Sequence, residues 1–360
     1  MSSNPSQNKA RKGRGAVTNP DCRYVAHRRE AVDDGWWPDD LEPPPLRTTV
    51  AVDSSRSVLT RNRSPDVPFD QSINPYRGCE HGCIYCYARP THAYLGLSPG
   101  LDFESRLLLK PRAAELLRQE LRRPGYVCRP IALGTNTDPY QPIERAWGIM
   151  RQLLEVLAEC RHPVSVVTKS ALVERDLDLL ADMAAQGLAE VTLSVTTLDR
   201  QLARRMEPRA AAPQRRLQTV RRLAEAGIPV GVLAAPVVPV LTDGELEAIA
   251  EAAADAGAGR LGYVLLRLPG EVQGLFKEWL QEHYPMQAAH VMSRLRDARG
   301  GRVNDPRFGT RMTGGGDYAA LIAQRLRVVC KRLGLNQTEA TLRTDRFRAP
   351  PAAEGQLSLF

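Results

Sequence analysis

Three cysteines stand close together in one short run of this 360-residue chain. Cys79, Cys83 and Cys86 have the spacing C-x3-C-x2-C within residues 74–89. Three thiolates on one loop are one ligand short of a closed zinc site. They also suit a [4Fe–4S] cluster, in which three cysteines leave one iron open to an exogenous ligand. The sequence therefore predicts a metal-binding loop, with the cluster as its favoured occupant.

Two alternatives to the cluster remain open. A zinc site could be completed by His81 or His92, because zinc takes four nitrogen, sulfur or oxygen ligands. Free thiols are the other alternative. A disulfide framework is not favoured, because the seven cysteines are odd in number and spread thinly over the chain.

The cysteine run also resembles a family signature. C-x3-C-x2-C with an aromatic residue just before the third cysteine, here Tyr85, is typical of the radical S-adenosylmethionine (SAM) superfamily. The resemblance implies that the three cysteines bind three irons and that SAM chelates the fourth. It also implies reductive cleavage of SAM to methionine and a 5′-deoxyadenosyl radical, with the electron supplied by a flavodoxin-like or ferredoxin-like donor.

An alternation of short apolar runs and amphipathic runs begins near residue 69 and predicts the fold. The predicted strands lie at 71–74, 130–134, 163–168, 190–196, 228–234 and 262–266. The predicted helices between and after them lie at 110–122, 143–159, 171–186, 213–226, 242–256 and 271–282. Six βα units predict an α/β fold, a partial (β/α)6 TIM-type barrel with a parallel sheet. Extra C-terminal helices are expected at 286–298 and 317–333, and both termini are expected to be flexible.

Several helix ends carry local signals. Ser170 is expected to cap the helix that opens at the next residue, and Pro213 suits a first helical position. Thr242 and Glu245 have the spacing of a capping box. Gly227 stands where a helix needs a left-handed residue to end.

The chain divides into four predicted segments. Residues 1–64 form a basic, then acidic and proline-rich N-terminal extension, and residues 65–284 form the barrel. Residues 285–336 form a C-terminal helical segment. Residues 337–360 form a flexible tail.

Polar residues at the predicted strand ends are candidates for binding SAM. In parallel βα folds, functional groups gather at the carboxyl ends of the strands. Lys169 follows the third strand and is expected to pair with the SAM carboxylate. Ser194, on the fourth strand, and Asn136, after the second, are expected to bind the ribose, with Asn136 also within reach of the amine. The backbone at Tyr85 and the apolar run 235–239 are expected to face the adenine.

A narrower resemblance covers roughly residues 65–270. The cysteine loop, the run Arg89-Pro-Thr-His and the run 137–142 (Thr-Asp-Pro-Tyr-Gln-Pro) are similar to the branch that contains spore photoproduct lyase and DNA repair photolyase-like proteins. This resemblance implies a damaged or modified DNA base as substrate. The position at which the lyase carries its hydrogen-donating cysteine falls on Thr135, which has no thiol. Tyr140 is the predicted hydrogen donor, with simple packing as its alternative role, and Asp138 is the second predicted catalytic residue of this loop.

The C-terminus carries a second motif that points to DNA. The last five residues resemble the peptide by which bacterial repair and replication proteins dock on the sliding clamp: Gln356, Leu357, Ser358, Leu359 and Phe360. An apolar anchor at the end of a tether suits binding to a preformed pocket. The clamp and DNA are therefore the predicted macromolecular partners.

Composition limits the class of protein and its cellular location. A net charge of +8 with 43% hydrophobic residues is typical of a globular protein that can approach nucleic acid. No apolar run reaches the roughly 18–20 residues of a membrane span, and no secretory leader is seen, so a cytoplasmic enzyme is expected. Two other functions stay open. One is a radical SAM enzyme acting on RNA, a peptide or a metabolite, and the other is a non-enzymatic, DNA-associated iron–sulfur protein.

Overall fold

A seven-stranded sheet forms the centre of the protein, which a computed structural model describes over residues 10–25, 46–338 and 341–351. The strand order is β10-β9-β8-β7-β6-β3-β2. Neighbours are parallel, except that β2 and β3 run antiparallel. The strands are β2 (Leu59–Arg61), β3 (Gln71–Ile73), β6 (Ile131–Leu133), β7 (Val164–Thr168), β8 (Ala189–Ser194), β9 (Val230–Val237) and β10 (Arg260–Leu265).

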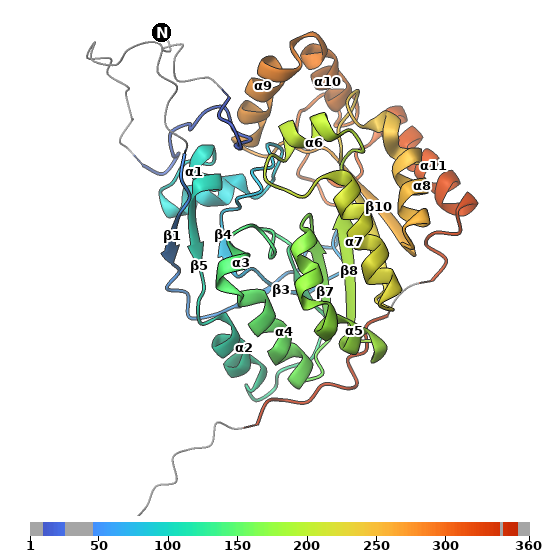
Figure 1. The fold of residues 1–360 in the computed structure, drawn as a ribbon. Helices are drawn as coiled ribbons and strands as arrows, with labels where there is room; N and C mark the ends of the chain where they lie inside the picture. The colour runs from blue at the N-terminus through green and yellow to red at the C-terminus, as the bar shows by residue number, and fades with distance from the viewer. Residues whose placement is uncertain (1–9, 26–45, 339–340, 352–360) are drawn as a thin grey trace, which may run out of the picture.

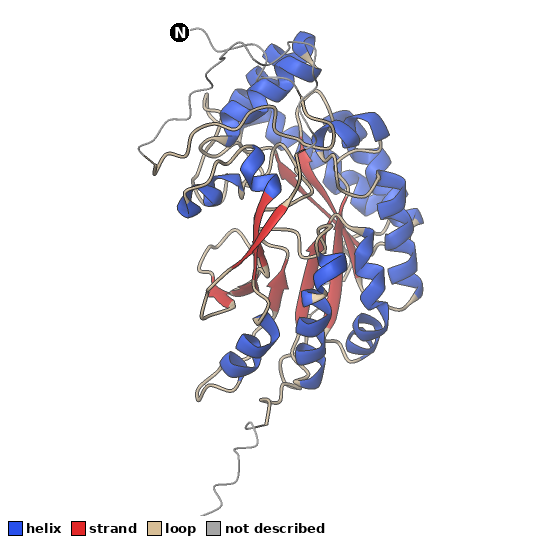
Figure 2. Ribbon diagram, turned by 60° about the vertical axis from the view of Figure 1, so that its left-hand side comes forward, coloured by secondary structure: helices blue, strands red, loops and turns tan. Residues whose placement is uncertain are grey.

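Helices follow the parallel strands and cover the outer face of this sheet (Figures 1 and 2). They are α2 (Ala113–Leu121), α4 (Ile149–Glu159), α5 (Leu177–Ala185), α7 (Pro213–Glu225) and α8 (Leu246–Asp255). Each turns an apolar stripe inward; in α4 the buried side chains include Met150, Leu153, Leu154 and Leu157. The sheet curves without closing, since β2 and β10 remain its two edges. The predicted partial barrel with six parallel strands is therefore confirmed.

The carboxyl ends of the strands are covered by a helical layer. Helices α9 (Val272–His283) and α10 (Pro285–Asp297) pack into the same apolar cluster as Ile84 of the cysteine loop, α9 through Phe276 and Trp279 and α10 through Val291 and Leu295. Helix α11 (Gly316–Arg332) packs beside α8. Shorter helices complete the chain: η2 (Arg89–Leu95), α1 (Leu101–Ser105), α3 (Glu144–Trp147), η3 (Ala171–Asp176), α6 (Arg200–Met206) and η4 (Asp243–Glu245). Among the described helices, none is both long and apolar enough to cross a membrane.

A second, three-stranded sheet was not predicted from the sequence. Strand β5 (Arg106–Leu109) pairs in parallel with β1 (Thr49–Val52) and antiparallel with β4 (Tyr76–Arg77). Strands β1 and β2 both come from the segment predicted as the N-terminal extension. That extension therefore contributes to both sheets.

The described part of the N-terminus packs on the cysteine loop. The buried Arg14 donates hydrogen bonds to the backbone oxygens of Leu46 and Glu104, both at 2.6 Å. The backbone N–H groups of Gly15 and Ala16 donate to the Glu104 carboxylate at 2.9 and 2.8 Å. A Cβ atom at Gly15 would lie 1.9 Å from the Gly82 oxygen, so only glycine fits here. Residues 10–25, within the terminus predicted to be flexible, are thus tied to the core by long-range contacts.

The C-terminal segment 341–351 crosses the opposite end of the barrel, far from the cysteine loop (Figure 1). The amide of Arg343 donates to the Gly187 oxygen, and the amide of Arg348 donates to the Cys160 oxygen. The ring of Phe347 lies 5.3 Å from that of His162, centre to centre. The predicted clamp motif, at 356–360, lies outside the described residues, as do residues 1–9.

Most of the predicted helix ends are confirmed. Ser170 accepts a hydrogen bond from the Leu172 amide, Pro213 is the first residue of α7, and Gly227 has φ of +75°. The Thr242–Glu245 capping box is wrong. The Thr242 hydroxyl accepts instead from the Val238 amide, and Glu245 accepts hydrogen bonds from the neighbouring loop after β8.

Candidate active site

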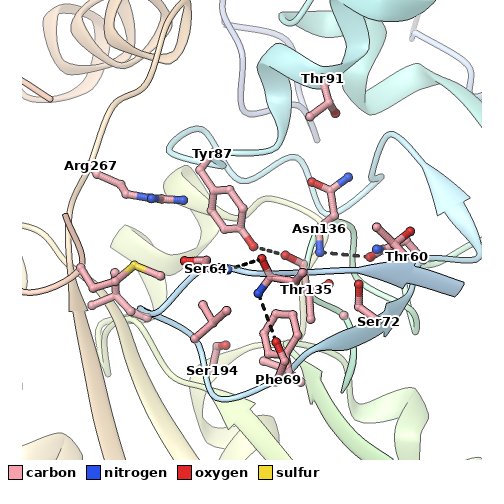
Figure 3. A pocket seen from close by; sticks show the side chains of 18 of the residues that line it. Thr60, Ser64, Phe69, Ser72, Tyr87, Thr91, Thr135, Asn136, Ser194 and Arg267 are labelled. Carbon is pink, nitrogen blue, oxygen red and sulfur yellow. Dashed lines mark hydrogen bonds between the residues drawn. The ribbon is translucent and has the colours of Figure 1, made fainter. Parts of the chain in front are cut away.

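A cavity of about 710 Å³ opens where the parallel strands end (Figure 3). The segments that follow β3, β6, β7 and β10 all contribute to its lining, together with the ends of β8 and β9. Gly134 lets the segment after β6 approach β7 closely, because a Cβ atom there would lie 2.0 Å from the Val167 oxygen. The cavity thus occupies the place where parallel βα folds put their functional groups.

The structure brings together the four residues predicted to bind SAM. Tyr85, Asn136, Lys169 and Ser194 all line the cavity. The Lys169 ammonium lies 5.9 Å from the centre of the Tyr85 ring and has no ion-pair partner among the described residues. The Ser194 hydroxyl and the Asn136 side-chain amide likewise make no hydrogen bond within the described part of the chain. These three groups are therefore free to bind a ligand.

The cysteine loop borders this cavity and is held by backbone hydrogen bonds from two directions. The amide of Cys79 donates to the Phe103 oxygen at 2.8 Å, and the amide of Ile84 donates to the Met206 oxygen at 3.0 Å. Cys79 and Cys83 are buried, and Cys86 is half-buried. Tyr85 and Tyr87, on either side of Cys86, reach the cavity. The three thiols therefore lie beside the cavity on a fixed loop.

Burial and nearby donor groups act in opposite directions on the three thiols. Burial raises the pKa of Cys83 to about 12 and raises that of Cys79 well above its ordinary value, so free thiols here stay protonated. Positive groups oppose this effect, because Lys169 favours the thiolate of Cys83. Backbone N–H groups do the same at Cys79 and Cys86. Such donors stabilise the thiolates by which cysteine binds iron–sulfur clusters.

A buried arginine donates hydrogen bonds to the backbone of the cysteine loop. Arg89 is fully buried and donates to the backbone oxygens of Gly82 and Cys83 at 3.0 and 2.9 Å. It also forms an ion pair with Glu104, which is equally buried. Glu104 in turn accepts from the N-terminal segment at Gly15 and Ala16. Arg89 and Glu104 thus connect the cysteine loop to the N-terminal segment, a link that the sequence did not predict.

A second buried ion pair lies beneath the SAM-binding candidates. Arg216 and Glu207 form a buried pair, and the Tyr85 hydroxyl donates to Glu207. Arg216 also donates to the backbone oxygen of Ser194 at 2.9 Å. Burial disfavours the charged carboxylate, but Arg216 and Lys169 outweigh it and hold the pKa of Glu207 at about 2. This network, also missed from the sequence, fixes Tyr85 and the end of β8.

The predicted catalytic residue Asp138 is absent from the cavity lining. Its carboxylate accepts hydrogen bonds from the Thr168 hydroxyl at 2.6 Å and from the Lys169 amide at 2.8 Å. It also lies 3.3 Å from His81 Nδ1. Burial opposes ionisation, but these partners outweigh it and hold the pKa of Asp138 at about 2. The structure therefore gives Asp138 a positioning role, joining the cysteine loop to the segment that carries Lys169.

The histidines considered as zinc ligands bond elsewhere. His81 contacts Asp138, and His92 Nε2 lies 3.0 Å from the Arg106 oxygen. Within the described ranges, no three His, Cys, Asp or Glu side chains form a group that could hold a single metal ion. The geometry therefore does not support the zinc alternative. The three-thiol donor set, with its N–H groups and nearby cations, fits a cluster.

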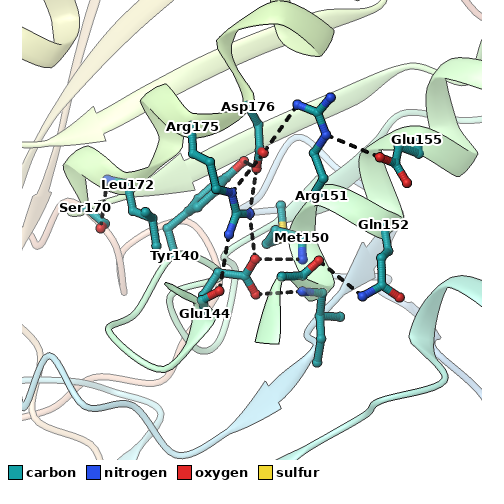
Figure 4. A network of polar contacts seen from close by, with 12 residues as sticks. Tyr140, Glu144, Met150, Arg151, Gln152, Glu155, Ser170, Leu172, Arg175 and Asp176 are labelled. Carbon is teal, nitrogen blue, oxygen red and sulfur yellow. Dashed lines mark hydrogen bonds and ion pairs between the residues drawn. The ribbon is translucent and has the colours of Figure 1, made fainter. Parts of the chain in front are cut away.

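The predicted hydrogen donor Tyr140 lies in the core rather than at the cavity (Figure 4). Its hydroxyl donates to Asp176 at 2.9 Å, and Arg175 joins Asp176 to Glu144. Figure 4 shows this network beside the start of α4, where the Met150 amide donates to Glu144 and Arg151 forms further ion pairs with Asp176 and Glu155. The structure gives no support for hydrogen transfer by Tyr140.

Tyr87 is the cavity tyrosine that the sequence analysis missed. The residue lines the cavity and is 43% exposed, and its hydroxyl donates to the backbone oxygen of Thr135 (Figure 3). Arg267 lies over the ring at 4.7 Å from its centre. The only signal in the sequence was its place directly after Cys86. A phenol therefore lies next to the position where the missing thiol was expected.

Comparison with known proteins agrees with this geometry. The family model for the radical SAM superfamily matches residues 73–253. An uncharacterized protein of Mycobacterium tuberculosis is 41% identical over 233 residues, covering 64% of this chain and 67% of that protein. An uncharacterized protein of Methanocaldococcus jannaschii is 27% identical over 213 residues, covering 59% of this chain and 76% of that protein.

Solved structures share the fold. Spore photoproduct lyase complexed with dinucleoside spore photoproduct has a TM-score of 0.56 at 16% identity, covering 79% of this chain and 80% of that one. A mutant of the lyase with bound AdoMet and the same dinucleoside has a TM-score of 0.57. The partial barrel and its three-cysteine loop together are the features of a class of iron–sulfur enzymes. The chain belongs to the radical SAM superfamily, which uses a [4Fe–4S] cluster and SAM.

Proposed function

We propose that this protein cleaves SAM reductively at a [4Fe–4S] cluster held by Cys79, Cys83 and Cys86, and acts on a damaged or modified base in DNA. One observation carries the first part. The three-cysteine loop borders a cavity into which an unpaired cation and two unbonded polar side chains project. When bound, the cluster and SAM supply a 5′-deoxyadenosyl radical that abstracts a hydrogen atom from the substrate.

Each SAM-binding candidate has a distinct task in this proposal. Lys169 pairs with the carboxylate of SAM. Burial lowers the pKa of Lys169, but the nearby Cys83 and Glu207 raise it by more, so the side chain stays in its ammonium form. Ser194 and Asn136 hydrogen-bond the ribose. An apolar wall that includes Ala235 and Leu266 excludes water from the reacting end of the cavity.

Two further observations support DNA as the substrate. The chain has a net charge of +8, and its fold is shared with a lyase that has been solved with a dinucleoside photoproduct. Thr135 lacks the thiol expected of the lyase branch, so photoproduct reversal with a cysteine donor is not proposed; the proposed reaction begins with abstraction of a hydrogen atom from a base. Tyr87, whose hydroxyl is held beside Thr135, replaces Tyr140 as the proposed hydrogen donor. Its O–H gives a hydrogen atom to the substrate radical, and the tyrosyl radical left behind takes an electron from the flavodoxin-like or ferredoxin-like donor and a proton from solvent.

The partners follow from the same proposal. A reduced flavodoxin-like or ferredoxin-like protein donates the electron in the cytoplasm. Residues 356–360 dock on the bacterial sliding clamp and bring the enzyme to DNA under replication or repair.

The test is anaerobic and uses the full chain. We reconstitute the cluster, add dithionite and SAM, and quantify 5′-deoxyadenosine with and without irradiated DNA, undamaged DNA, RNA and peptide. Product that rises with irradiated DNA supports the proposal. A rise with RNA or peptide alone overturns the DNA assignment. No product in any mixture from a chain with about four irons supports the non-enzymatic alternative.

Lys169→Gln is expected to weaken SAM binding by about ten- to a hundredfold, because a charge-assisted hydrogen bond to a carboxylate contributes about 1.5–3 kcal/mol. Equilibrium binding of SAM to the reconstituted protein measures this loss. Lys277→Gln, on the exposed face of α9, is the matched control and should bind SAM as the wild type does. Equal affinities for Lys169→Gln and wild type would remove Lys169 from the SAM site.

Tyr87→Phe is expected to keep SAM cleavage but to lower the yield of substrate-derived product at least tenfold, because it removes the proposed hydrogen donor. The measurement is the ratio of product to 5′-deoxyadenosine. Tyr140→Phe should leave this ratio unchanged and cost about 1 kcal/mol of folding stability through its lost hydrogen bond. The opposite pattern in the two variants would restore Tyr140 as the donor.

A further inference from the structure

The lining of the cavity is strongly biased in charge. No Asp or Glu side chain is found among the described residues that line it, whereas six cations are: Arg61, Arg77, Lys110, Lys169, Arg267 and Arg311. Two of the six are neutralised by neighbours, since Arg77 pairs with Asp53 and Arg311 pairs with Asp66. Lys169 is assigned to the SAM carboxylate above. Three cations remain for another ligand.

These three cations lack ion-pair partners among the described residues, although Arg267 lies over the Tyr87 ring. Arg61, Lys110 and Arg267 form no ion pair with any residue in the described part of the chain, and Lys110 and Arg267 are half-buried. Burial lowers the pKa of Lys110 by more than the carboxylates of Asp53 and Glu120 raise it. SAM does not account for them, because its sulfonium and amine are themselves cationic. A half-buried cation without a partner is a ready site for an anion.

The three cations come from separate segments around the opening. Arg61 ends β2, Lys110 directly follows β5, and Arg267 lies just beyond β10. Strands β2 and β10 are the two edges of the open sheet. Cations spread in this way suit successive phosphates of a chain better than one small anion.

Exposed aromatic rings accompany these cations. Tyr94 lines the cavity with 69% of its surface exposed, and its ring stacks on that of Tyr24 at 5.4 Å with an interplanar angle of 23°. The guanidinium of Arg23 lies 4.9 Å from the Tyr24 ring centre. Rings exposed beside arginines are the surfaces on which proteins stack unpaired bases.

Resting on the DNA substrate of the proposed function, we propose that these residues form a single-strand site: Arg61, Lys110 and Arg267 bind backbone phosphates, and Tyr94, backed by Tyr24, stacks a base that is unpaired or extruded from a duplex. The site presents one nucleotide to the residues proposed to bind SAM in the same cavity. A paired base inside a duplex cannot make this stacking contact.

Binding to labelled oligonucleotides tests the site without any turnover. Fluorescence anisotropy of the full, reconstituted chain is measured with a 12-nucleotide single strand of DNA, its duplex and the matching RNA, at several salt concentrations. The single strand should bind more tightly than the duplex. Arg61→Gln and Arg267→Gln should each lower the slope of log affinity against log salt by about 0.7, the value for one phosphate contact on a single strand. Tyr94→Ala should weaken binding about tenfold with the slope unchanged.

A control variant and three contrary results decide whether the single-strand site exists. Arg221→Gln, at an exposed position of α7 away from the cavity, should leave affinity and slope unchanged. Tighter binding of the duplex, a matching loss in Arg221→Gln, or unchanged slopes in both cavity variants would overturn the single-strand site. Tighter binding of RNA would overturn DNA as its ligand. Because SAM cleavage is measured separately, failure of the radical chemistry and failure of this site give different results.

Discussion

Cys83→Ala is expected to abolish the formation of 5′-deoxyadenosine in the anaerobic assay. Cys83 is buried in the loop beside the cavity, and its backbone oxygen accepts from Arg89, so the sulfur cannot be replaced by a neighbouring ligand without moving the loop. Loss of one of three thiolates leaves two protein ligands for a four-iron cluster. We therefore expect iron to fall from about four per chain to less than half of that value, with product at background level.

A matched cysteine separates ligand loss from unfolding. Cys160 is also buried, at the end of α4, and lies in the core of the barrel rather than at the cavity. Cys160→Ala should keep iron content and 5′-deoxyadenosine at wild-type levels, at a modest cost in thermal stability from the lost volume. Full product in Cys83→Ala would contradict the assignment of the cysteine loop, whereas loss in both variants would point to misfolding.

The six parallel strands were predictable because each is a short, buried run bounded by turn residues. Every predicted strand overlaps an observed one, since the periodic signal is local. The small sheet escaped prediction for a physical reason. Strand β1 is exposed along its whole length and β4 has two residues, so neither carries a burial pattern. Their pairing depends on β5, tens of residues away, and local sequence does not report such contacts.

The site shows the same division. Lys169, Ser194 and Asn136 were found because parallel strands bring their ends together, which is a rule of the fold rather than of the side chain. The rule does not say which way a loop side chain points. Tyr140 therefore turned out to be in the core, whereas Tyr87, on a loop known only for its cysteines, reaches the cavity. Direction within a loop is set by tertiary hydrogen bonds such as that from Tyr140 to Asp176.

The buried ion pairs were also beyond sequence analysis. Arg89 begins η2 and Glu104 lies in α1, 15 residues further along the chain. Charged residues are almost never fully buried unless paired, and these two form an ion pair. Arg14 lies in a segment with the composition of a mobile tail, yet it is buried and donates a hydrogen bond to the backbone oxygen of Glu104. Around the cysteine loop the protein thus depends on long-range charge pairing, which composition does not reveal.

Because the loop depends on this pairing, we expect Arg89→Met to lower both the folding stability and the iron content strongly. The substitution leaves Glu104 as a buried carboxylate without its cation and removes the donors to the backbone oxygens of Gly82 and Cys83. Breaking a buried ion pair costs about 3–5 kcal/mol of folding free energy. Urea unfolding of the chain before reconstitution measures this loss, and iron content after reconstitution should fall as well, because the loop that carries the cysteines is released.

Two comparison variants show whether the iron loss is specific to the loop. Arg216→Met breaks the other buried pair, so it should lose comparable stability yet retain more iron. In the described part of the chain, Arg216 makes no hydrogen bond to the backbone of the cysteine loop and donates instead to the Ser194 oxygen. Arg89→Met combined with Glu104→Gln removes both charges and should recover part of the folding free energy, whereas iron content should stay low because the loop oxygens still lack their donor. Normal iron binding in that double variant would show that Arg89 stabilises the fold without holding the cysteine loop in place.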